Sequence, residues 1–338
     1  MRMRTFESVW FGKRLALACF VLAAAFLVSL RVADAFAAEA YPARPVRLIN
    51  PWAAGGPADF VGRLYARGLS ELWGTQVITD NRPGASGIIG TEIVTRAAPD
   101  GYTLLFSTIS TFAINGILIK KIPYDVDRDL TLVGITAIAP YILAVRADLP
   151  ARTVPELIAL AKNQPGKLSF ASAGPGTIVH MAGEQFKHQA GIDILHVPFK
   201  SGGPALVGVL SNEVDMMVSD LSTILVHVKG GRLRAFAAAH PRRLRPLPDV
   251  PTFAELGYPG IESSAWWAFA APAKTTRAVL TRLEAAHAAV LARPDYIERL
   301  AELAIEAPAM SAEQTAAFVK REIEKWARVV ATANVRIE

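Results

Sequence analysis

Three polar turns in the sequence carry the residue types that bind a small anion. Residues 51–59 read PWAAGGPAD, residues 172–177 read SAGPGT and lead to His180, and residues 219–223 read SDLST. Each turn follows a short apolar run that predicts a buried strand, and the first two open a predicted helix. The first N–H groups of a helix point outward, its dipole is positive there, and glycine lets a ligand approach the backbone. The turns therefore favour an anion site; the alternative is that they are plain strand–helix connections.

Two enzymatic interpretations of these residues are weaker. Asp59, Ser172 and His180 have the residue types of a hydrolytic triad, but the sequence lacks the Gly-x-Ser-x-Gly turn that presents a nucleophilic serine. His180 and Glu184 have the spacing of a metal pair on a helix, without the second histidine of a zinc-peptidase motif. The other histidines lack the spacing of metal ligands. We therefore predict that the chain is not an enzyme and holds neither a metal nor a cofactor.

The first 37 residues have the three parts of a secretory signal peptide. A basic start, which contains Arg2 and Lys13, precedes an apolar run at residues 15–30 and the small-residue motif Ala35-Phe36-Ala37. We predict cleavage after Ala37 and a mature protein in the bacterial periplasm. One alternative is a single membrane anchor, although the run is shorter than the roughly 20 residues that a span needs. Another is a lipid anchor on Cys19, although the apolar run continues beyond that cysteine.

The composition of the predicted mature chain excludes several classes of protein. Cys19 is the only cysteine and lies in the signal peptide, so the mature chain has no disulfide and no thiolate metal site. The leader removes five basic and two acidic residues, which lowers the net charge from +6 to about +3. No basic run is interleaved with aromatic residues, so nucleic acid is not an expected partner. A weak positive charge suits an anionic ligand, and about 300 residues suffice for two domains.

Short apolar runs alternate with amphipathic stretches, which predicts α/β domains. The expected strands are residues 46–49, 76–80, 102–107, 168–171, 194–197, 214–218 and 233–238. Residues 275–334 predict two or three helices without a strand, and these must pack back on the first domain. Their return implies two chain crossovers, near residues 141–145 and 266–269. The predicted lobes are residues 38–142 with 266–338, and residues 143–265.

A series of short motifs runs along the chain in a recognisable order. Tyr41-Pro42-Ala43-Arg44-Pro45 comes first, and the turn at residues 51–59 follows, with Trp52 where relatives carry Phe. The later motifs are NRPG at 81–84, APDGYT at 98–103, AIN at 113–115, YD at 124–125, SAG at 172–174, His180, HVPFK at 196–200, LPDVPT at 247–252 and KW at 325–326. These motifs resemble the receptors of tripartite tricarboxylate transporters, the TctC or Bug family of periplasmic solute-binding proteins. The resemblance covers essentially the whole predicted mature chain.

The resemblance implies an α/β fold with two lobes, the type II periplasmic-binding-protein or Venus flytrap fold, in which each lobe is a sheet flanked by helices. It also implies that a small organic carboxylate binds in the cleft between the lobes. The receptor would deliver that ligand to the membrane subunits of a tripartite transporter, and we expect it to be a monomer. Two other roles stay open: a periplasmic hydrolase of a small acid or ester, and a ligand-sensing partner of a membrane kinase.

The resemblance also assigns the ligand-binding residues. The first-lobe cradle consists of Trp52, Gly55, Gly56, Ala58 and Asp59. The second-lobe cradle consists of Ser172, Ala173, Gly176, Thr177 and His180. The remaining wall consists of Ser107, Thr108, Ser219 and Asp220. Asp59 is further expected to cap the helix that it opens, by accepting from backbone N–H groups.

Departures from the family pattern bear on the choice of ligand. Pro175 removes an amide donor, and Ile178 and Val179 stand where relatives often carry hydroxyl groups. Trp52 enlarges an apolar wall. If the adjacent Trp266 and Trp267 alternate on a strand, one packs in a lobe and the other can face the cleft; the alternative is that both are core residues. These features favour an aromatic or apolar mono- or dicarboxylate over citrate or aspartate. The alternative is that Ile178 and Val179 face the core of the lobe and carry no information about the ligand.

Overall fold

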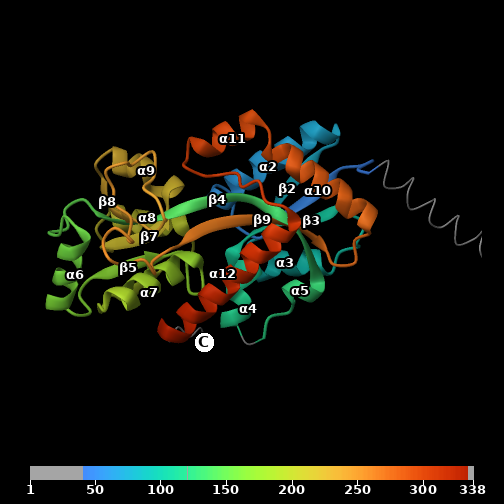
Figure 1. Ribbon diagram of the computed structural model, residues 1–338. Coiled ribbons are helices and arrows are strands. Elements are labelled where there is room, and N and C mark those ends of the chain that lie inside the picture. Colours follow the sequence, from blue (N-terminus) through green and yellow to red (C-terminus); the bar gives the residue numbers. More distant parts are fainter. Residues whose placement is uncertain (1–40, 120, 334–338) are drawn as a thin grey trace, which may run out of the picture.

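The computed structural model describes residues 41–119 and 121–333, so the predicted signal peptide, with Cys19 and the cleavage motif, lies outside the described residues. These residues form two α/β lobes at the two ends of an elongated molecule (Figure 1). The strands are β1 Val46–Asn50, β2 Val77–Asn81, β3 Thr103–Thr108, β4 Leu130–Arg146, β5 Ser169–Ser172, β6 Leu195–Pro198, β7 Met216–Asp220, β8 Leu233–Ala238 and β9 Ser264–Pro272.

The helices fall between these strands and at the end of the chain. They are α2 Pro57–Trp73, η1 Ala85–Gly87, α3 Ile88–Thr95, η2 Ser110–Ile114, α4 Asn115–Leu118, α5 Val126–Asp129, α6 Val154–Asn163, α7 Ile178–Ala190, α8 Gly202–Leu210, α9 Leu221–Lys229, α10 Arg277–Leu291, α11 Pro294–Ala301 and α12 Ala312–Ala333. Within the described ranges, no helix is long and apolar enough to cross a membrane.

The sheet of the first lobe has the order β2-β1-β3-β9-β4. Its first three strands run parallel and β9 runs antiparallel to β3. One face is covered by α2 and α10, where Tyr65 of α2 packs edge-on against Phe269 of β9. The opposite face is covered by α3 and α12, and Phe318 of α12 packs edge-on against Trp266 of β9. Helices on both faces bury the sheet, and the carboxyl ends of β1, β2 and β3 lie at one edge because the three strands run parallel.

Strand β4 is long enough to serve both lobes. It pairs with β9 up to Pro140 and with β7 and β8 from Tyr141 onward. The chain re-enters the first sheet at Ser264, where β9 begins, so Trp267 lies inside that sheet. The limits of the lobes stay a prediction, but the strand pairing changes partners at these two places.

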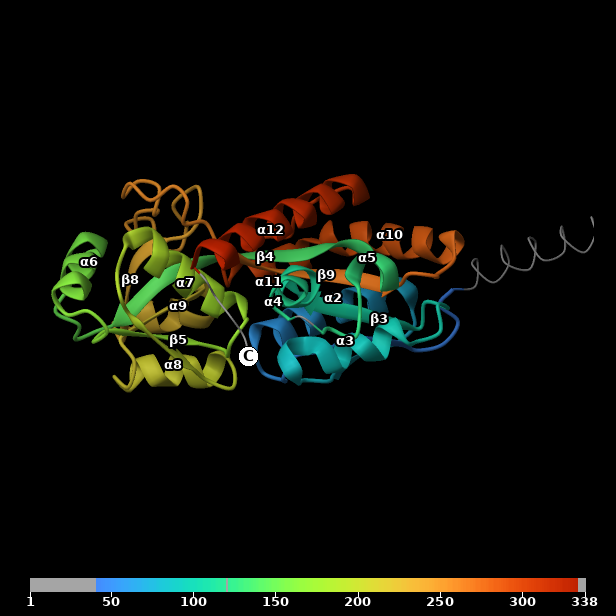
Figure 2. The ribbon, with the colours of Figure 1, turned by 90° about the horizontal axis from the view of Figure 1, so that it is seen from below.

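Helix α12 does more than return to the first lobe. It contacts η2, α4 and β4, and it also contacts α7 of the second lobe. Figure 2 shows α12 running from the first lobe toward α7. One contiguous group of buried apolar side chains accordingly includes Trp326 of α12 and Phe186 of α7. A separate cluster of buried apolar side chains lies in the second lobe, around Val209 of α8 and Leu225 of α9.

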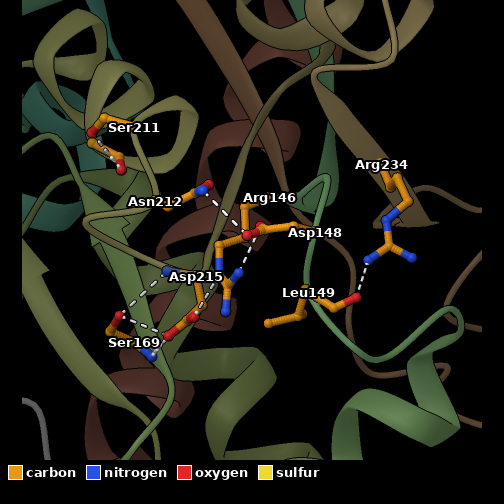
Figure 3. Close-up of polar contacts among 9 residues, drawn as sticks. Arg146, Asp148, Leu149, Ser169, Ser211, Asn212, Asp215 and Arg234 are labelled. Atoms are coloured by element: carbon orange, nitrogen blue, oxygen red, sulfur yellow. Dashed lines mark hydrogen bonds and ion pairs between the residues drawn. The ribbon is translucent and has the colours of Figure 1, made fainter.

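A polar network holds the second sheet together at the end remote from the glycine turns (Figure 3). The Arg146 Nε atom lies 2.9 Å from Asp215 Oδ1, and Asp215 Oδ2 accepts from the Ser169 backbone N–H at 2.8 Å and from its hydroxyl at 3.0 Å. The three residues lie at the adjacent ends of β4, β5 and β7. The shared carboxylate therefore joins three strands, and two of them, β5 and β7, end at the candidate site residues Ser172 and Asp220.

Candidate functional site

The first glycine loop, residues 51–59, is closed by a carboxylate. Asp59 Oδ2 accepts from the Gly55 N–H at 3.0 Å, and Asp59 Oδ1 accepts from Asn81 Nδ2 at 2.9 Å. Arg63 Nε lies 3.0 Å from the same carboxylate, one helical turn further along α2. Gly55 has φ +84, a left-handed conformation that glycine adopts without strain. Asp59 therefore ties the loop to the helix and to β2.

The expected helix cap at Asp59 is wrong in its position. The N-cap residue of α2 is Gly56, no side chain caps it, and Asp59 stands in the first helical turn. Asp59 reaches back to the N–H of Gly55, which precedes the cap. Burial works to raise the pKa of Asp59, but hydrogen bonds from Arg63, Gly55 and Asn81 outweigh it and the pKa is lowered.

The second glycine loop, residues 172–177, is closed by neutral groups. The Gly176 N–H donates to His180 Nδ1 at 3.1 Å, and the Thr177 hydroxyl donates to the Gly174 carbonyl at 2.7 Å. Ser172 Oγ lies 2.7 Å from His196 Nε2, and the same oxygen accepts from the Gly174 N–H at 3.1 Å. Thr177 is the N-cap of α7. The loop is thus held by two imidazoles and two hydroxyls.

The two imidazoles of this loop stack on each other and are held neutral. The ring centroids of His180 and His196 are 3.9 Å apart, and Phe170 stacks on His196 at 5.0 Å. Burial, then the charges of His196 and Lys187, lowers the pKa of His180 to about 3. Burial, then Lys187, lowers the pKa of His196 to about 4. An imidazole that accepts at Nδ1 cannot be protonated there, so the loop geometry requires the neutral form.

The third turn and the end of β3 are also closed on themselves. Asp220 is the N-cap of α9, and its carboxylate accepts from the Thr223 N–H at 3.0 Å and from the Thr223 hydroxyl. The Ser219 hydroxyl donates weakly to Asp220, at 3.4 Å. Ser107 Oγ lies 2.7 Å from Thr111 Oγ1. Thr108 Oγ1 accepts from the Ser110 N–H at 3.3 Å. Sequence reasoning placed these residues in one wall, and their own hydroxyl partners are local.

Another loop of the first lobe, residues 84–87, was absent from the predicted site. Gly84, Ala85, Ser86 and Gly87 all have positive φ, which is uncommon for the two non-glycine residues. Asn115 Nδ2 donates to the Ser86 carbonyl at 3.0 Å and fixes the loop. A Cβ on Gly87 would lie 3.4 Å from the ring of Trp52. The two glycines in the sequence NRPGASG, residues 81–87, were the signal that could have identified this loop.

The loops leave some backbone N–H groups free and commit others. Gly55 and Gly176 donate to side chains of their own loops, so neither can donate to a ligand. Among the described residues, the N–H groups without a protein acceptor at the helix starts are those of Gly56 and Ala58 in the first lobe, and of Ala173, Ile178 and Val179 in the second. The first turns of α2 and α7 thus offer N–H donors together with the positive ends of two helix dipoles.

The side chains of Ile178 and Val179 do not carry the argument about the ligand. Each is 7 % exposed and belongs to the main apolar core. Helix α7, which they open, packs against β5 and β7. Their burial supports the alternative that they face the core, and their backbone N–H groups are what they can offer to a ligand.

The hydrolytic triad is not assembled in the described structure. Ser172 contacts His196, whereas His180 accepts from Gly176, and Asp59 is engaged by Arg63 and Asn81 in the other lobe. Glu184 Oε1 lies 3.8 Å from His180 Nε2, and burial raises the pKa of Glu184. Among the described residues there is no group of three His, Cys, Asp or Glu side chains placed to hold a metal ion.

Comparison with known proteins shows the fold and the family to which the chain belongs. The fold is that of the periplasmic binding proteins. Residues 61–335 match the tripartite tricarboxylate transporter family receptor, TctC, and the chain belongs to that family.

Several relatives are similar over nearly their whole length. The protein BugT of Bordetella pertussis is 34% identical over 314 residues, 93% of this chain and 96% of that protein. An R. palustris protein solved with adipate superposes with a TM-score of 0.83 at 32% identity, covering 88% of this chain and 99% of that one. MatC from Rhodopseudomonas palustris with bound malate has a TM-score of 0.80 at 30% identity, covering 86% of this chain and 100% of that one.

Proposed function

We propose that the chain captures a small aliphatic dicarboxylate between the first and second glycine loops and delivers it to the membrane subunits of a tripartite transporter. The observation that carries this proposal is the pairing of two helix starts, on different lobes, whose N–H groups at Gly56, Ala58, Ile178 and Val179 have no protein acceptor. Two positive helix ends attract a carboxylate without a lysine or arginine in the site. Because the donors lie on separate lobes, closure of the lobes is what encloses the ligand.

The choice of an aliphatic acid rests on chemistry and on relatives. Adipate and malate, the acids bound by two similar proteins, are both saturated dicarboxylates. Ile178 and Val179 are buried in the core, so their side chains do not favour an aromatic acid over an aliphatic one. Trp52 still offers a partly buried apolar ring beside the loops, which suits the methylene groups of an aliphatic chain. Aromatic acids are therefore compared with the aliphatic acids in the experiment that follows.

A thermal-shift panel on the mature chain tests the ligand class. The panel compares adipate and malate with citrate, aspartate, benzoate and terephthalate, and uses the diamide of adipic acid as the uncharged control. A ligand at about 100 times its Kd stabilises the folded chain by about 2.7 kcal/mol, so a dicarboxylate should raise Tm in proportion to the logarithm of its concentration. Stabilisation by the diamide as strong as by adipate would contradict carboxylate capture.

The remaining parts of the proposal concern export, oligomeric state and turnover. We propose cleavage after Ala37 and release of a monomer into the periplasm, where osmotic shock should recover it. N-terminal sequencing of the released chain should begin at Ala38, and native mass spectrometry should show one subunit with its acid bound and chemically unchanged. A full-length chain in the membrane fraction, or conversion of the acid, would contradict these parts.

A further inference from the structure

Buried polar atoms without a partner gather at one edge of the first lobe. The described residues contain six buried side-chain nitrogen or oxygen atoms without a hydrogen bond, and three of them, Asn50 Oδ1, Trp52 Nε1 and Trp267 Nε1, lie at the carboxyl edge of the first-lobe sheet. A buried donor left unpaired costs about 1–3 kcal/mol, so such atoms are rare in folded proteins and need a reason. A ligand site supplies that reason, because the bound molecule completes the hydrogen bonds.

Strand register places Trp267 at the floor of the proposed site. Trp267 is paired with Thr108, the last residue of β3, on one side and with Ala137 of β4 on the other. Four residues beyond Ala137, at Tyr141, β4 passes to the partners of the second lobe. Trp267 therefore lies in the last row that β9 shares with β3, three rows before the β4–β9 pairing ends at Pro140, at the crossover. Opening of the two lobes about that crossover would uncover this row.

The neighbouring tryptophan shows what a purely structural indole looks like here. Trp266 points to the opposite face of β9, where it stacks with Phe112 at 6.0 Å, and its Nε1 donates to Glu322 Oε2 at 3.2 Å. Trp326 Nε1 donates to the same oxygen at 3.2 Å. On the other face, Trp267 is 2 % exposed and its Nε1 has no acceptor. Of the two adjacent indoles, one is satisfied inside the lobe and the other is not.

We propose that Trp267 is a ligand-contacting residue whose indole N–H donates to an oxygen of the bound acid. The inference rests on the proposed function and adds a side-chain donor to a site otherwise built from backbone N–H groups. An indole donates but cannot accept, so its partner on the ligand must be an acceptor, such as a carboxylate oxygen. Since the indole is buried, water does not compete for it and the hydrogen bond gains strength.

Indole N–H signals in a 15N–1H spectrum of the mature chain test this directly. After assignment by single Trp→Phe variants, titration with adipate or malate should move the Trp267 signal downfield and leave those of Trp266 and Trp326 in place, because Glu322 already holds them. Binding that leaves the Trp267 signal unmoved would overturn this inference alone. An absence of binding by both acids would overturn the proposed function, and this inference with it.

Matched variants add an affinity readout by calorimetry. Trp267→Phe keeps an aromatic ring but removes the donor, and we expect about tenfold weaker binding, the size of one lost hydrogen bond. Trp266→Phe makes the same change on the opposite face and should alter Kd by less than about twofold, while lowering stability because it removes a donor from buried Glu322. Unchanged affinity in Trp267→Phe, or an equal loss in both variants, would contradict the assignment.

Discussion

The first and second glycine loops offer similar free N–H groups but are held by different chemistry. In the first lobe, the ionised Asp59 gathers the Gly55 N–H, Asn81 and the guanidinium of Arg63. In the second lobe, neutral His180 and His196 gather the Gly176 N–H and the Ser172 hydroxyl. One loop is closed by a charged group and the other by uncharged groups. In both, the closing side chain stands four residues after the glycine whose N–H it accepts, Asp59 after Gly55 and His180 after Gly176.

This difference predicts which change in pH or sequence disrupts each of the two glycine loops. The hydrogen bonds that lower the pKa of Asp59 keep its carboxylate ionised below the pH at which a free aspartate is protonated. The second loop requires unprotonated imidazoles, whose pKa values burial lowers to about 3 and about 4. Lowering the pH should therefore disrupt the second loop before the first. Substitution of Asp59, which removes its carboxylate, should disrupt the first loop.

Asp59→Ala should have the largest effect. The substitution leaves Gly55 and Asn81 without their acceptor and Arg63 without its counter-charge, and we expect a loss of about 3 kcal/mol in the free energy of unfolding. Ligand affinity should fall as well, because the loop that presents Gly56 and Ala58 is released. Urea unfolding and calorimetry measure the two effects.

Arg63→Gln is the matched control for Asp59→Ala. The Arg63 side chain is 55% exposed, so loss of this ion pair alone should cost less than about 1 kcal/mol. If the two variants lose equal stability, the carboxylate acts through the ion pair and not by closing the loop. If Asp59→Ala loses stability but binds normally, Asp59 is structural only.

Ser172→Ala should have the next largest effect. Ser172 is fully buried, and its hydroxyl is the partner of His196 Nε2 and of the Gly174 N–H. Removal of the hydroxyl leaves two buried groups unpaired, for which we expect about 2 kcal/mol of destabilisation. Salt should leave this loss unchanged, because none of the three groups is charged. A loss that disappears at high salt would show that the second loop is electrostatic after all.

The stability of the chain should depend on the two histidines in acid. The folded pKa of His180, about 3, lies below the value near 6.5 of an unfolded histidine, so the unfolded chain binds the proton first. Stability is complete above about pH 6.5 and falls as the pH drops toward 3, by up to about 1.4 kcal/mol per pH unit for each proton. His180→Asn, whose amide oxygen can replace Nδ1 as the acceptor, should reduce that slope by one proton.

His287 supplies the control for this titration. It is a buried histidine of the first-lobe core, near Tyr65, and burial lowers its pKa to about 4. His287→Asn should also reduce the acid slope of stability, but it should leave the pH dependence of ligand binding unchanged because His287 touches neither loop. If His180→Asn and His287→Asn alter binding alike, the second loop is not the acid-sensitive half of the site.

A smaller effect separates the two adjacent glycines of the first loop. Gly55 has φ +84, where an added Cβ costs about 1–2 kcal/mol. Gly56 has φ -90, and an added Cβ would meet nothing closer than the Ala53 carbonyl at 3.9 Å. Gly55→Ala should therefore lower Tm, whereas Gly56→Ala should leave Tm nearly unchanged and weaken binding by crowding its own N–H. The reverse order in Tm would contradict this description of the loop.

Local signals were enough to predict most of the elements. Thr153 and Glu156 have the spacing of a capping box, and the Glu156 N–H donates to Thr153 Oγ1. Gly191 is a residue type that ends helices, and α7 ends where it adopts φ 60. Strand β8 matches its predicted bounds, Leu233–Ala238. These features depend on residues a few positions apart, which a sequence displays directly.

The contacts that define the site could not be predicted, because they join distant residues. The Ser172–His196 contact spans 24 positions and follows from the parallel pairing of β5 with β6. The burial of Ile178 depends on how α7 packs, and the different environments of Trp266 and Trp267 depend on Glu322, 56 positions from Trp266. Neither the composition of the chain nor the spacing of its residues specifies these strand registers and packing contacts.

A crystal structure of the mature chain grown with adipate tests the central claim most directly. The account predicts a carboxylate group between the two lobes, with an oxygen within about 3.2 Å of an N–H group at the start of α2 and of another at the start of α7. An acid held by one lobe alone, or bound away from both glycine loops, would contradict it.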